Sequence, residues 1–371
     1  MENERGILME KLTGKERISR LLRHEPVDRI GLYEHFWGDT HKEWTQNQGC
    51  GDDFTLEFGF DMDECWPTNM VARLEFEPEI VAETEDTITM LDGNWATLKR
   101  HKKHDTTPEH INFFIDDREK WETMVKPLLT DDSQLEKRIN FKAYREKKQY
   151  CKEHELFFVW SGVNVFECIH PLVGHEEMLA AMIYDPEWIE DMCETYADLT
   201  IKAQKLLFER EGLPDGIWYY EDMGYKGAPF MSPAMYERFL YPSHKRTCDY
   251  AHSLGLPVIM HSCGFVEPLL DGMIKAGING LQVIEIKAGM DLLRIYEKYG
   301  DKILLMGGID VREVYPNDLA RIDAELEKKI PAVMEKNCYV LHSDHSIPKT
   351  VNYEVYKYFV KKGLELGTYK E

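Results

Sequence analysis

Solid apolar runs, each followed by turn residues and a helix-like stretch, recur along the chain from residue 155 onward. Two of the helix-like stretches begin with a capping residue and a proline, at Asp185-Pro186 and Ser232-Pro233, which is typical of helix starts. Apolar runs that alternate with amphipathic helices predict parallel strands covered on both faces. The expected strands span residues 156–162, 216–222, 256–262, 278–285, 302–310 and 337–345.

The first 150 residues are less regular. Thr13 and Glu16 make a capping box ahead of an apolar stripe, which predicts an early helix, and the segment "EPVDRIGLYEHFW" then turns into a strand. Residues 70–150 are polar and mixed, and no elements are assigned there.

Six strand–helix units and two earlier strands together predict an α/β fold. We expect a (β/α)8 TIM barrel with an N-terminal helical extension, as a single domain over residues 1–371. A doubly wound sheet is the alternative. It would normally carry a glycine-rich phosphate-binding turn after its first strand, and neither GxGxxG nor GxxxxGK[ST] is present.

The residues that end the predicted strands carry the candidate chemistry, because barrel active sites lie at the carboxyl ends of the strands. His261 and Cys263 end one strand, and Gly264 permits a sharp exit from it. An imidazole and a thiolate suit zinc, which keeps an open position in catalytic sites. The alternative to zinc binding is a purely structural role, with a buried cysteine beside a hydrogen-bonded histidine.

A third metal ligand should come from another strand. Asp344 and His345, at the end of the last predicted strand, are the candidates, and His342 and Glu221 come after them. The adjacent acids Glu221 and Asp222 are candidate catalytic residues, as a base or a substrate clamp. Asp310, by contrast, could simply cap the helix that follows it.

Aromatic side chains gather near the predicted strand ends. Most of them will be core, but a subset that lines a pocket would favour a flat or cationic ligand. The set is Tyr33, Phe36, Trp37, Trp66, Trp160, Phe166, Trp218, Tyr219, Tyr220 and Tyr225. The substrate-binding candidates are Tyr33, Trp37, Trp160, Tyr225, His342 and His345.

Charge and cysteine usage exclude several classes of function. The chain has 45 basic and 67 acidic side chains, a net charge of −22, which disfavours nucleic-acid and membrane-surface partners. Its eight cysteines are scattered without a CxxC pair, which indicates reduced thiols and a cytoplasmic protein. The first residues lack the apolar core of a secretory signal, and no window resembles a transmembrane segment. A homo-oligomer is left open.

Several segments together resemble the uroporphyrinogen decarboxylase superfamily, which also contains zinc-dependent, corrinoid-linked methyltransferases. They are "KERISRLLRHEPVDRIGL", "EDMGYKGAPFMSPAMYERFLYPSHKR", "VIMHSCGFVEPLLDGMIKAGINGLQVIE", "LLMGGID" and "HSDHSIP". The resemblance covers nearly the whole chain in order and is strongest over residues 215–350. It implies a (β/α)8 barrel with its cleft at the C-terminal face.

Details of the resemblance favour the methyltransferase branch. The decarboxylases carry an arginine-rich segment after the first strand, whereas "YEHFWGDTHKEW" contains no arginine here. The methyltransferases use His-x-Cys and a later cysteine as zinc ligands. His261 and Cys263 match the first two, and Asp344 stands where the later cysteine would be. Oxygen in place of sulfur would make the zinc a stronger Lewis acid.

The resemblance therefore implies a zinc-dependent methyltransferase that acts between a small methylated substrate and a corrinoid protein. A methoxylated aromatic, demethylated at oxygen, is the favoured substrate, because its poor leaving group most needs Lewis-acid assistance. The cobalamin would be carried by a separate partner, since the chain has no DxHxxG corrinoid-binding signature. The alternatives are a thiol-methylating enzyme, a metal-free decarboxylase-like lyase and a non-catalytic binding barrel.

Overall fold

The structure is a computed structural model that describes residues 11–105 and 107–370. Eight strands, β1, β2, β7, β8, β11, β12, β13 and β14, make up one sheet, and helices follow most of them. The fold is a (β/α)8 barrel, as the sequence predicts. The described chain divides into two compact units. The single domain expected over residues 1–371 stays a prediction.

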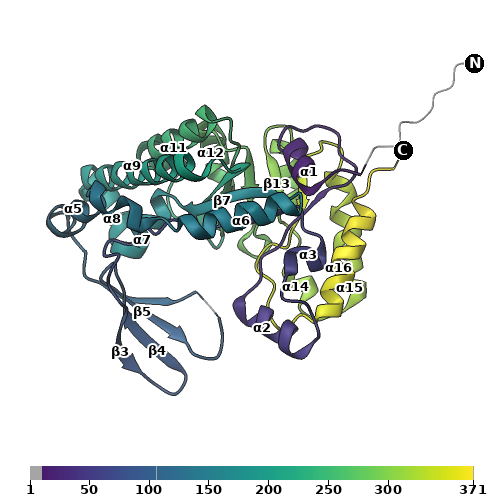
Figure 1. Cartoon of the computed structure of the whole chain (residues 1–371), viewed down its shortest axis with the longest axis horizontal. Coiled ribbons are helices and arrows are strands. Elements are labelled where there is room, and N and C mark those ends of the chain that lie inside the picture. The colour runs from purple at the N-terminus through teal and green to yellow at the C-terminus, as the bar shows by residue number, and fades with distance from the viewer. Residues whose placement is uncertain (1–10, 106, 371) are drawn as a thin grey trace, which may run out of the picture. The chain divides into compact units, whose positions relative to one another are not determined.

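The first unit combines three separated parts of the chain, namely the residues up to Glu64, Lys148–Val159 and the residues from Asn279 on. Its strands β1, β14, β13 and β12 pair in parallel in that order. The residues of these strands are buried throughout, as the solid apolar runs predict. Helices α15 and α16 lie side by side (Figure 1).

The elements of the first unit have the following bounds. The helices are α1 (Gly14–Leu21), α2 (Gly38–Asn47), α3 (Phe54–Phe58), α13 (Leu292–Tyr299), α14 (Val311–Val314), α15 (Leu319–Lys329) and α16 (Tyr353–Leu366), with 3-10 turns at Ile286–Ala288 and Pro331–Val333. The strands are β1 (Gly31–Leu32), β12 (Gly280–Gln282), β13 (Leu304–Met306) and β14 (Tyr339–Leu341). Three elements cross a boundary between the units, namely β2 (Met62–Cys65), α6 (Phe141–Glu153) and β7 (Phe157–Val163).

The second unit contains Cys65–Lys147 and Trp160–Ile278. Its helices are α4 (Arg118–Lys120), α5 (Lys126–Leu129), α7 (Val165–Val173), α8 (His175–Tyr184), α9 (Pro186–Glu211), α10 (Pro233–Phe239), α11 (Tyr241–Ser253) and α12 (Leu270–Ala276). A π-helical turn at Trp121–Val125 and 3-10 turns at Asp132–Arg138 and Glu267–Leu269 complete the helical elements. The barrel strands that lie wholly in this unit are β8 (Gly216–Tyr220) and β11 (Val258–His261), and β9 (Gly224–Tyr225) and β10 (Ala228–Pro229) form a short hairpin.

Local signals in the sequence set the helix starts. Thr13 and Glu16 form the predicted capping box at α1, and Asp185 caps α9 by accepting the backbone N–H of Trp188. Ser232 caps α10 in the same way. Asp310 caps α14 by accepting the N–H of Arg312, so the capping interpretation of this residue is confirmed.

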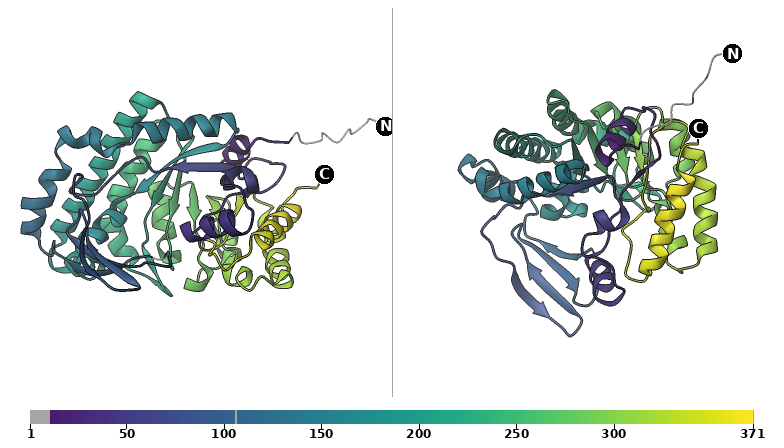
Figure 2. Two further views of the ribbon diagram at one scale, coloured as in Figure 1. Left: turned by 60° about the horizontal axis from the view of Figure 1, so that its bottom comes forward. Right: turned by 45° about the vertical axis from the view of Figure 1, so that its right-hand side comes forward.

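A four-stranded antiparallel sheet in the second unit is the main feature that the sequence does not predict. Its strands are β3 (Glu79–Glu83), β4 (Thr87–Leu91), β5 (Ala96–His101) and β6 (Glu109–Phe113), in that order across the sheet. Figures 1 and 2 show it as a layer beside the helices of its own unit, and β5 contacts α7. Every residue of β3 is exposed and every residue of β4 is half-buried, so neither strand has a hydrophobic face to detect.

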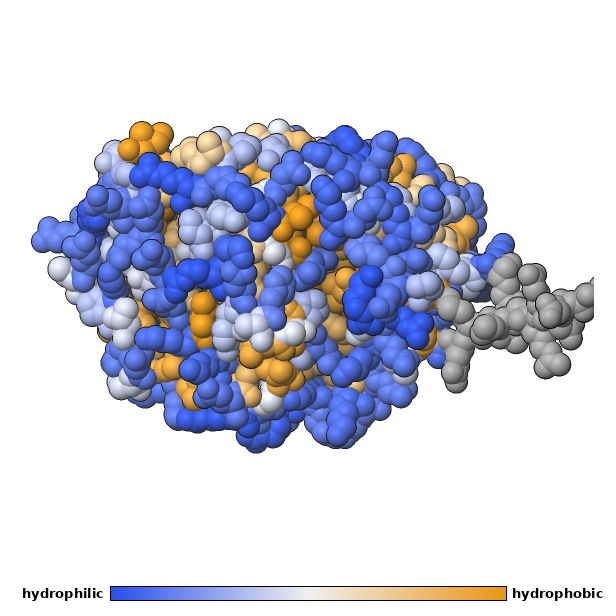
Figure 3. Space-filling view, turned by 90° about the horizontal axis from the view of Figure 1, so that it is seen from above, coloured by the Kyte–Doolittle hydropathy of each residue, from blue (hydrophilic) through white to orange (hydrophobic). Residues whose placement is uncertain are grey.

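Hydrophilic side chains dominate the surface seen in Figure 3, with apolar groups scattered between them. This pattern agrees with the 30% share of charged residues. None of the helices in the described ranges is both long and apolar enough to cross a membrane.

Candidate metal centre

Three potential metal ligands meet at the carboxyl ends of β8 and β11. These strands pair in parallel with His261 opposite Tyr220, so the residues that follow them emerge at the same edge of the sheet. His261 is the last residue of β11, Cys263 lies two positions beyond it, and Asp222 lies two positions beyond the end of β8. All three belong to the second unit.

The three donor atoms lie within one coordination sphere. His261 Nε2 is 3.1 Å from Asp222 Oδ1 and 3.3 Å from Cys263 Sγ, and all three ligand atoms fall within 4.8 Å of one another. No other group of three histidine, cysteine or acidic side chains meets this condition in the part of the chain that the structure describes. A nitrogen, a sulfur and an oxygen donor form a set that suits zinc.

The pKa values of Asp222 and His261 are shifted in the directions that favour a negative carboxylate and a positive imidazole. Burial by itself raises the pKa of Asp222, but the neighbouring His261 imidazole and the Cys263 N–H outweigh it and bring the pKa down to about 2. Burial lowers the pKa of His261, and Cys263 and Asp222 more than reverse this effect, so its pKa lies well above the ordinary value. The Asp222 side chain is still 42% exposed, so the cluster is open on that side, as a catalytic metal site requires.

Backbone contacts fix the loop that carries these donors. The N–H of Cys263 donates to Asp222 Oδ1 at 2.8 Å, and the N–H of Met223 donates to Ser262 Oγ at 3.0 Å. Gly264 has a φ of +82°, and a Cβ placed there would lie 2.2 Å from the carbonyl carbon of Gly224. Only glycine fits this close approach of two loops, which confirms the expected sharp exit after Cys263.

Glu221 points away from this cluster. It is fully buried and accepts hydrogen bonds from the N–H groups of Phe166 at 3.1 Å and Glu167 at 2.7 Å, at the start of α7. His244 Nε2 lies 2.6 Å from its Oε1, and Tyr236 contacts the other nitrogen of His244 at 3.0 Å. These contacts connect β8 to α7, α10 and α11, and the catalytic role of Glu221 stays a prediction.

Asp344 lies in the first unit, after β14. Its carboxylate accepts the backbone N–H groups of Ile286 at 2.9 Å and Val311 at 2.8 Å. Burial raises its pKa to about 6. These hydrogen bonds hold the loops after β12 and β13, and the role of Asp344 as a metal ligand stays a prediction.

The first unit holds a second polar cluster, which includes one predicted substrate-binding residue. Buried His342 lies 3.2 Å from Glu34 and 3.1 Å from His35, through its two different ring nitrogens. The other nitrogen of His35 lies 3.2 Å from Glu64, and Gln282 lies 3.3 Å from His342. The sequence signal that could have identified Glu34 and His35 is their position shortly after the first predicted strand. The spacing of residues does not show, however, in which direction the side chains point once the strand has ended.

Five further substrate-binding candidates lie in different environments. Tyr33 is buried and donates to Glu64 at 3.4 Å. The rings of Trp37 and His345 are 5.8 Å apart. Trp160 is buried against Tyr219, and Tyr225 is 66% exposed. A substrate contact for each of these residues stays a prediction.

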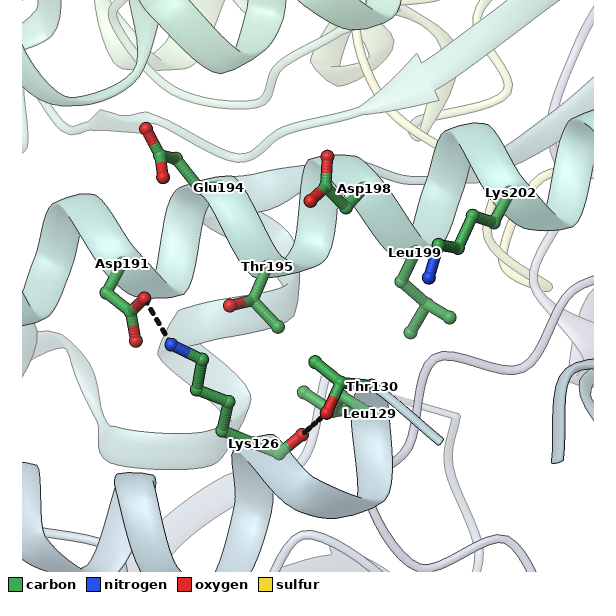
Figure 4. A pocket seen from close by; sticks show the side chains of 9 residues that line it. All are labelled: Lys126, Leu129, Thr130, Asp191, Glu194, Thr195, Asp198, Leu199 and Lys202. Atoms are coloured by element: carbon green, nitrogen blue, oxygen red, sulfur yellow. Dashed lines mark hydrogen bonds and ion pairs between the residues drawn. The ribbon is translucent and has the colours of Figure 1, made fainter. Parts of the chain in front are cut away.

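A groove between α5 and α9 is a weaker candidate for a site (Figure 4). It has a volume of about 200 Å³ and is lined mainly by charged side chains. Lys126 pairs with Asp191 at 2.6 Å, Lys202 pairs with Asp132 at 2.6 Å, and Asp198 pairs with Arg246. Several of the charged side chains in the groove are already neutralised by ion pairs at the surface, so their presence does not require a ligand.

Comparisons with known proteins agree with the fold. A sequence profile described as uroporphyrinogen decarboxylase (URO-D) matches residues 166–364, which is more than half of the chain. No curated protein matches the chain. The structure of a methyltransferase from Methanosarcina mazei has a TM-score of 0.67 and 18% identity, over 95% of this chain and 99% of that one. This likeness concerns the fold alone.

A second solved structure, a Xaa-Pro dipeptidase with bound methionine in its active site, reaches a TM-score of only 0.29. It is 11% identical over 61% of this chain and 59% of that chain, and a TM-score this low does not indicate a shared fold.

Proposed function

Because this chain belongs to the uroporphyrinogen decarboxylase family, we propose that it is a zinc-dependent methyltransferase. It moves a methyl group between a small methylated substrate and a corrinoid carried by a separate protein. The observation that carries the proposal is the cluster of Asp222, His261 and Cys263, with one oxygen, one nitrogen and one sulfur donor. The fold shared with the Methanosarcina mazei methyltransferase supports it further.

The donor set fits a zinc ion that keeps a position for substrate. When bound, zinc would polarise the oxygen of a methyl donor, while the partner's reduced corrinoid supplies the electron pair that takes the methyl group. The carbon–oxygen electron pair then stays on oxygen, and the alcohol or phenol product takes one proton. A methoxylated aromatic is the substrate that we propose, because its phenoxide leaving group gains most from this assistance.

The chain's own residues prepare this site. The Cys263 N–H holds the Asp222 carboxylate, and the low pKa of Asp222 keeps it anionic and ready to bind a cation at neutral pH. The Tyr220 ring stacks on the His261 imidazole, with centroids 4.6 Å apart and planes 29° apart, which fixes the ring plane of this donor. Asp222, at 42% exposure, leaves an approach for the substrate.

A decarboxylase-like lyase without metal is the second candidate, and the family description favours it. It requires a set of cationic side chains for a polycarboxylate, and the segment after β1 offers Glu34 and His35 instead. The two candidates differ in one observable: the lyase releases carbon dioxide and does not depend on zinc.

Methyl transfer to free reduced cobalamin tests the proposal. The purified chain is incubated with cob(I)alamin and a methyl ether, and the change in the cobalamin absorption spectrum is followed with zinc and after treatment with a chelator. We expect transfer that zinc restores after chelation and that the double variant His261→Ala, Cys263→Ala loses. His154→Ala, which removes an exposed histidine elsewhere, is the control. Zinc-independent transfer, or no transfer with any methyl ether, would contradict the proposal.

A further inference from the structure

The backbone of the Asp222 donor is held by a residue from another element of the second unit. The Asp222 N–H donates to Glu167 Oε2 at 3.3 Å, and Glu167 lies near the start of α7. The Asp222 carboxylate separately accepts the Cys263 N–H at 2.8 Å. One contact to the backbone and one to the side chain together limit how far this donor can move.

His170 holds Glu167 in turn. It lies one turn further along α7, and its Nε2 is 2.8 Å from Glu167 Oε2, the same oxygen that accepts the Asp222 N–H. Because this carboxylate oxygen acts as an acceptor, Nε2 carries the proton of the imidazole. The His170 side chain is 8% exposed, and its ring stacks on His175 with centroids 4.2 Å apart and planes 25° apart. This packing keeps the ring against Glu167.

The start of α7 and the end of β8 are connected in both directions. Asn164, the N-cap of α7, makes no side-chain capping hydrogen bond. Glu221 accepts the N–H groups of Phe166 and Glu167 in its place, from beyond the end of β8. Glu167 returns a contact by accepting the N–H of Asp222. This exchange has the logic of a capping box built from two chain segments, and it ties the helix start to the loop that carries the donor.

Three carboxylates gather at this point, and their surroundings give them different roles. His244 lies 2.6 Å from Glu221, and His170 lies 2.8 Å from Glu167, so each of these two carboxylates has an imidazole beside it. The Glu221 side chain is fully buried and that of Glu167 is 23% exposed, whereas Asp222 is 42% exposed and faces the other two donors. Asp222 is therefore the carboxylate that a cation can reach, and the other two hold its loop.

We propose that Glu167 is a positioning residue of the metal centre, and that His170 keeps it in place. The pair fixes Asp222 beside His261 and Cys263 before the metal binds, which raises the affinity of the centre for zinc. Residues outside the ligand set commonly change metal affinity by about 10–100-fold in this way. The inference rests on the metal centre of the proposed function, and it adds the residues that hold one donor in place.

Metal binding to the full chain, without methyl transfer, tests this role. Glu167→Leu removes the acceptor, whereas Glu167→Gln keeps one carbonyl oxygen, which can accept both the Asp222 N–H and the His170 N–H because both contacts fall on Oε2. We expect Glu167→Leu to weaken zinc at least about tenfold in competition titrations, and Glu167→Gln to remain close to the wild type. The absorption spectrum of bound Co²⁺, which reports the geometry of the donors, should change only in Glu167→Leu. Equal losses in both variants would overturn the positioning role.

The part played by His170 is measured separately. His170→Phe keeps an aromatic ring in the stack but removes the group that donates to Glu167, and it should weaken zinc several-fold. His175→Phe, which exchanges the neighbouring ring of the same stack, is the matched control and should leave the zinc affinity unchanged. Circular dichroism and urea denaturation check that each variant folds. Equal weakening in His170→Phe and His175→Phe would assign the effect to ring packing and overturn the role of His170.

Amide hydrogen exchange in the metal-free protein separates failure of this inference from failure of the proposed function. Exchange over residues 216–225 should rise in Glu167→Leu and not in Glu167→Gln, because only the leucine leaves the Asp222 N–H without its acceptor. If exchange rises in this way but the wild type binds no zinc, Asp222 is positioned as proposed and the proposed function fails. If the wild type binds zinc and transfers methyl groups but Glu167→Leu changes neither zinc affinity nor exchange, the positioning role alone is wrong.

Discussion

Asp222 and Asp344 are the two candidates for the third metal ligand. Asp222 lies 3.1 Å from the His261 donor and is anionic, whereas Asp344 already accepts two backbone N–H groups and has a pKa raised to about 6. A carboxylate that holds loops together has fewer lone pairs left for a cation. The contacts therefore favour Asp222.

We predict that Asp222→Asn weakens zinc binding at least about tenfold, because even loss of an outer-shell partner costs this much. Asp344→Asn should retain zinc but lower the free energy of unfolding by about 1–3 kcal/mol, since its NH2 group would face a backbone N–H and leave it unsatisfied. Zinc competition titrations and urea denaturation measure the two effects. The reverse result, with zinc lost only in Asp344→Asn, would assign the ligand to Asp344.

Glu34 gives a prediction of pH dependence. Burial raises its pKa to about 8, so the folded chain keeps a proton that the unfolded chain releases near the ordinary value of 4.5. The unfolded state then binds fewer protons between these two values, and stability falls as the pH rises through this window. The loss of stability is on the order of 5 kcal/mol at most.

Glu34→Gln should remove this part of the pH dependence, because an amide does not titrate. The free energy of unfolding, measured by urea denaturation from pH 5 to pH 8, should fall less steeply in the variant than in the wild type. Glu146→Gln, at a glutamate whose side chain is 66% exposed, is the control and should keep the wild-type slope. Equal slopes in Glu34→Gln and the wild type would mean that Glu34 ionises normally.

The proximity of His261 and Cys263 could be predicted from the sequence, because both residues lie at the carboxyl end of an apolar run that is typical of a buried strand. The roles of Glu221 and Asp222 could not be separated in this way. The two residues are adjacent beyond the end of β8, and their side chains turn in opposite directions. One lies buried against α7 and the other faces His261. Spacing alone does not tell which neighbour turns inward once the chain has left the strand.

At the scale of elements, the loop after β11 depends on one glycine. Gly264 has a positive φ and sits against the backbone of Gly224, whereas Gly255 has a φ of +75° with nothing within 4 Å of an added Cβ. A comparison of substitutions at Gly255 and Gly264 therefore separates two free-energy costs, that of the backbone conformation and that of the close contact.

We predict that Gly255→Ala costs about 1 kcal/mol of stability, and that Gly264→Ala costs at least ~2 kcal/mol more. Gly264→Ala should also weaken zinc binding, since its Cβ would push apart the loops that carry Cys263 and Asp222. Thermal unfolding and zinc titration measure both effects. Similar losses in the two variants would show that the close contact does not matter.

The elements themselves were predictable where burial is strong. The runs expected at 216–222, 256–262 and 302–310 contain β8, β11 and β13, although the observed strands are shorter because their flanking residues already bend away at the sheet edge. The sheet of β3 to β6 could not be predicted, for the opposite reason. Its strands pair with one another while much of both faces remains in solvent, so the sequence carries no alternation.

At the scale of the molecule, the division into two units cuts across the chain order. The first unit collects three separated parts of the sequence, and no proline-, glycine- or serine-rich linker marks its boundaries. A discontinuous unit of this kind leaves no compositional signal. All three proposed zinc donors nevertheless lie in the second unit.

We predict that zinc stabilises the second unit locally. Removing zinc with a chelator should raise amide hydrogen exchange in residues 216–225 and 258–266, because a ligand that binds only the folded loops suppresses their opening. Exchange of α15 and α16 in the first unit should change little. The comparison requires hydrogen exchange with mass spectrometry on the same protein with and without zinc. A uniform change in hydrogen exchange along the chain would contradict local stabilisation of the second unit by zinc.

The most direct test of the metal centre is the metal content of the purified chain, measured by mass spectrometry beside that of the double variant His261→Ala, Cys263→Ala. We predict stoichiometric zinc in the wild type and its loss in a double variant that still folds. A wild type that remains metal-free after purification with zinc, or a double variant that retains the metal, would contradict it.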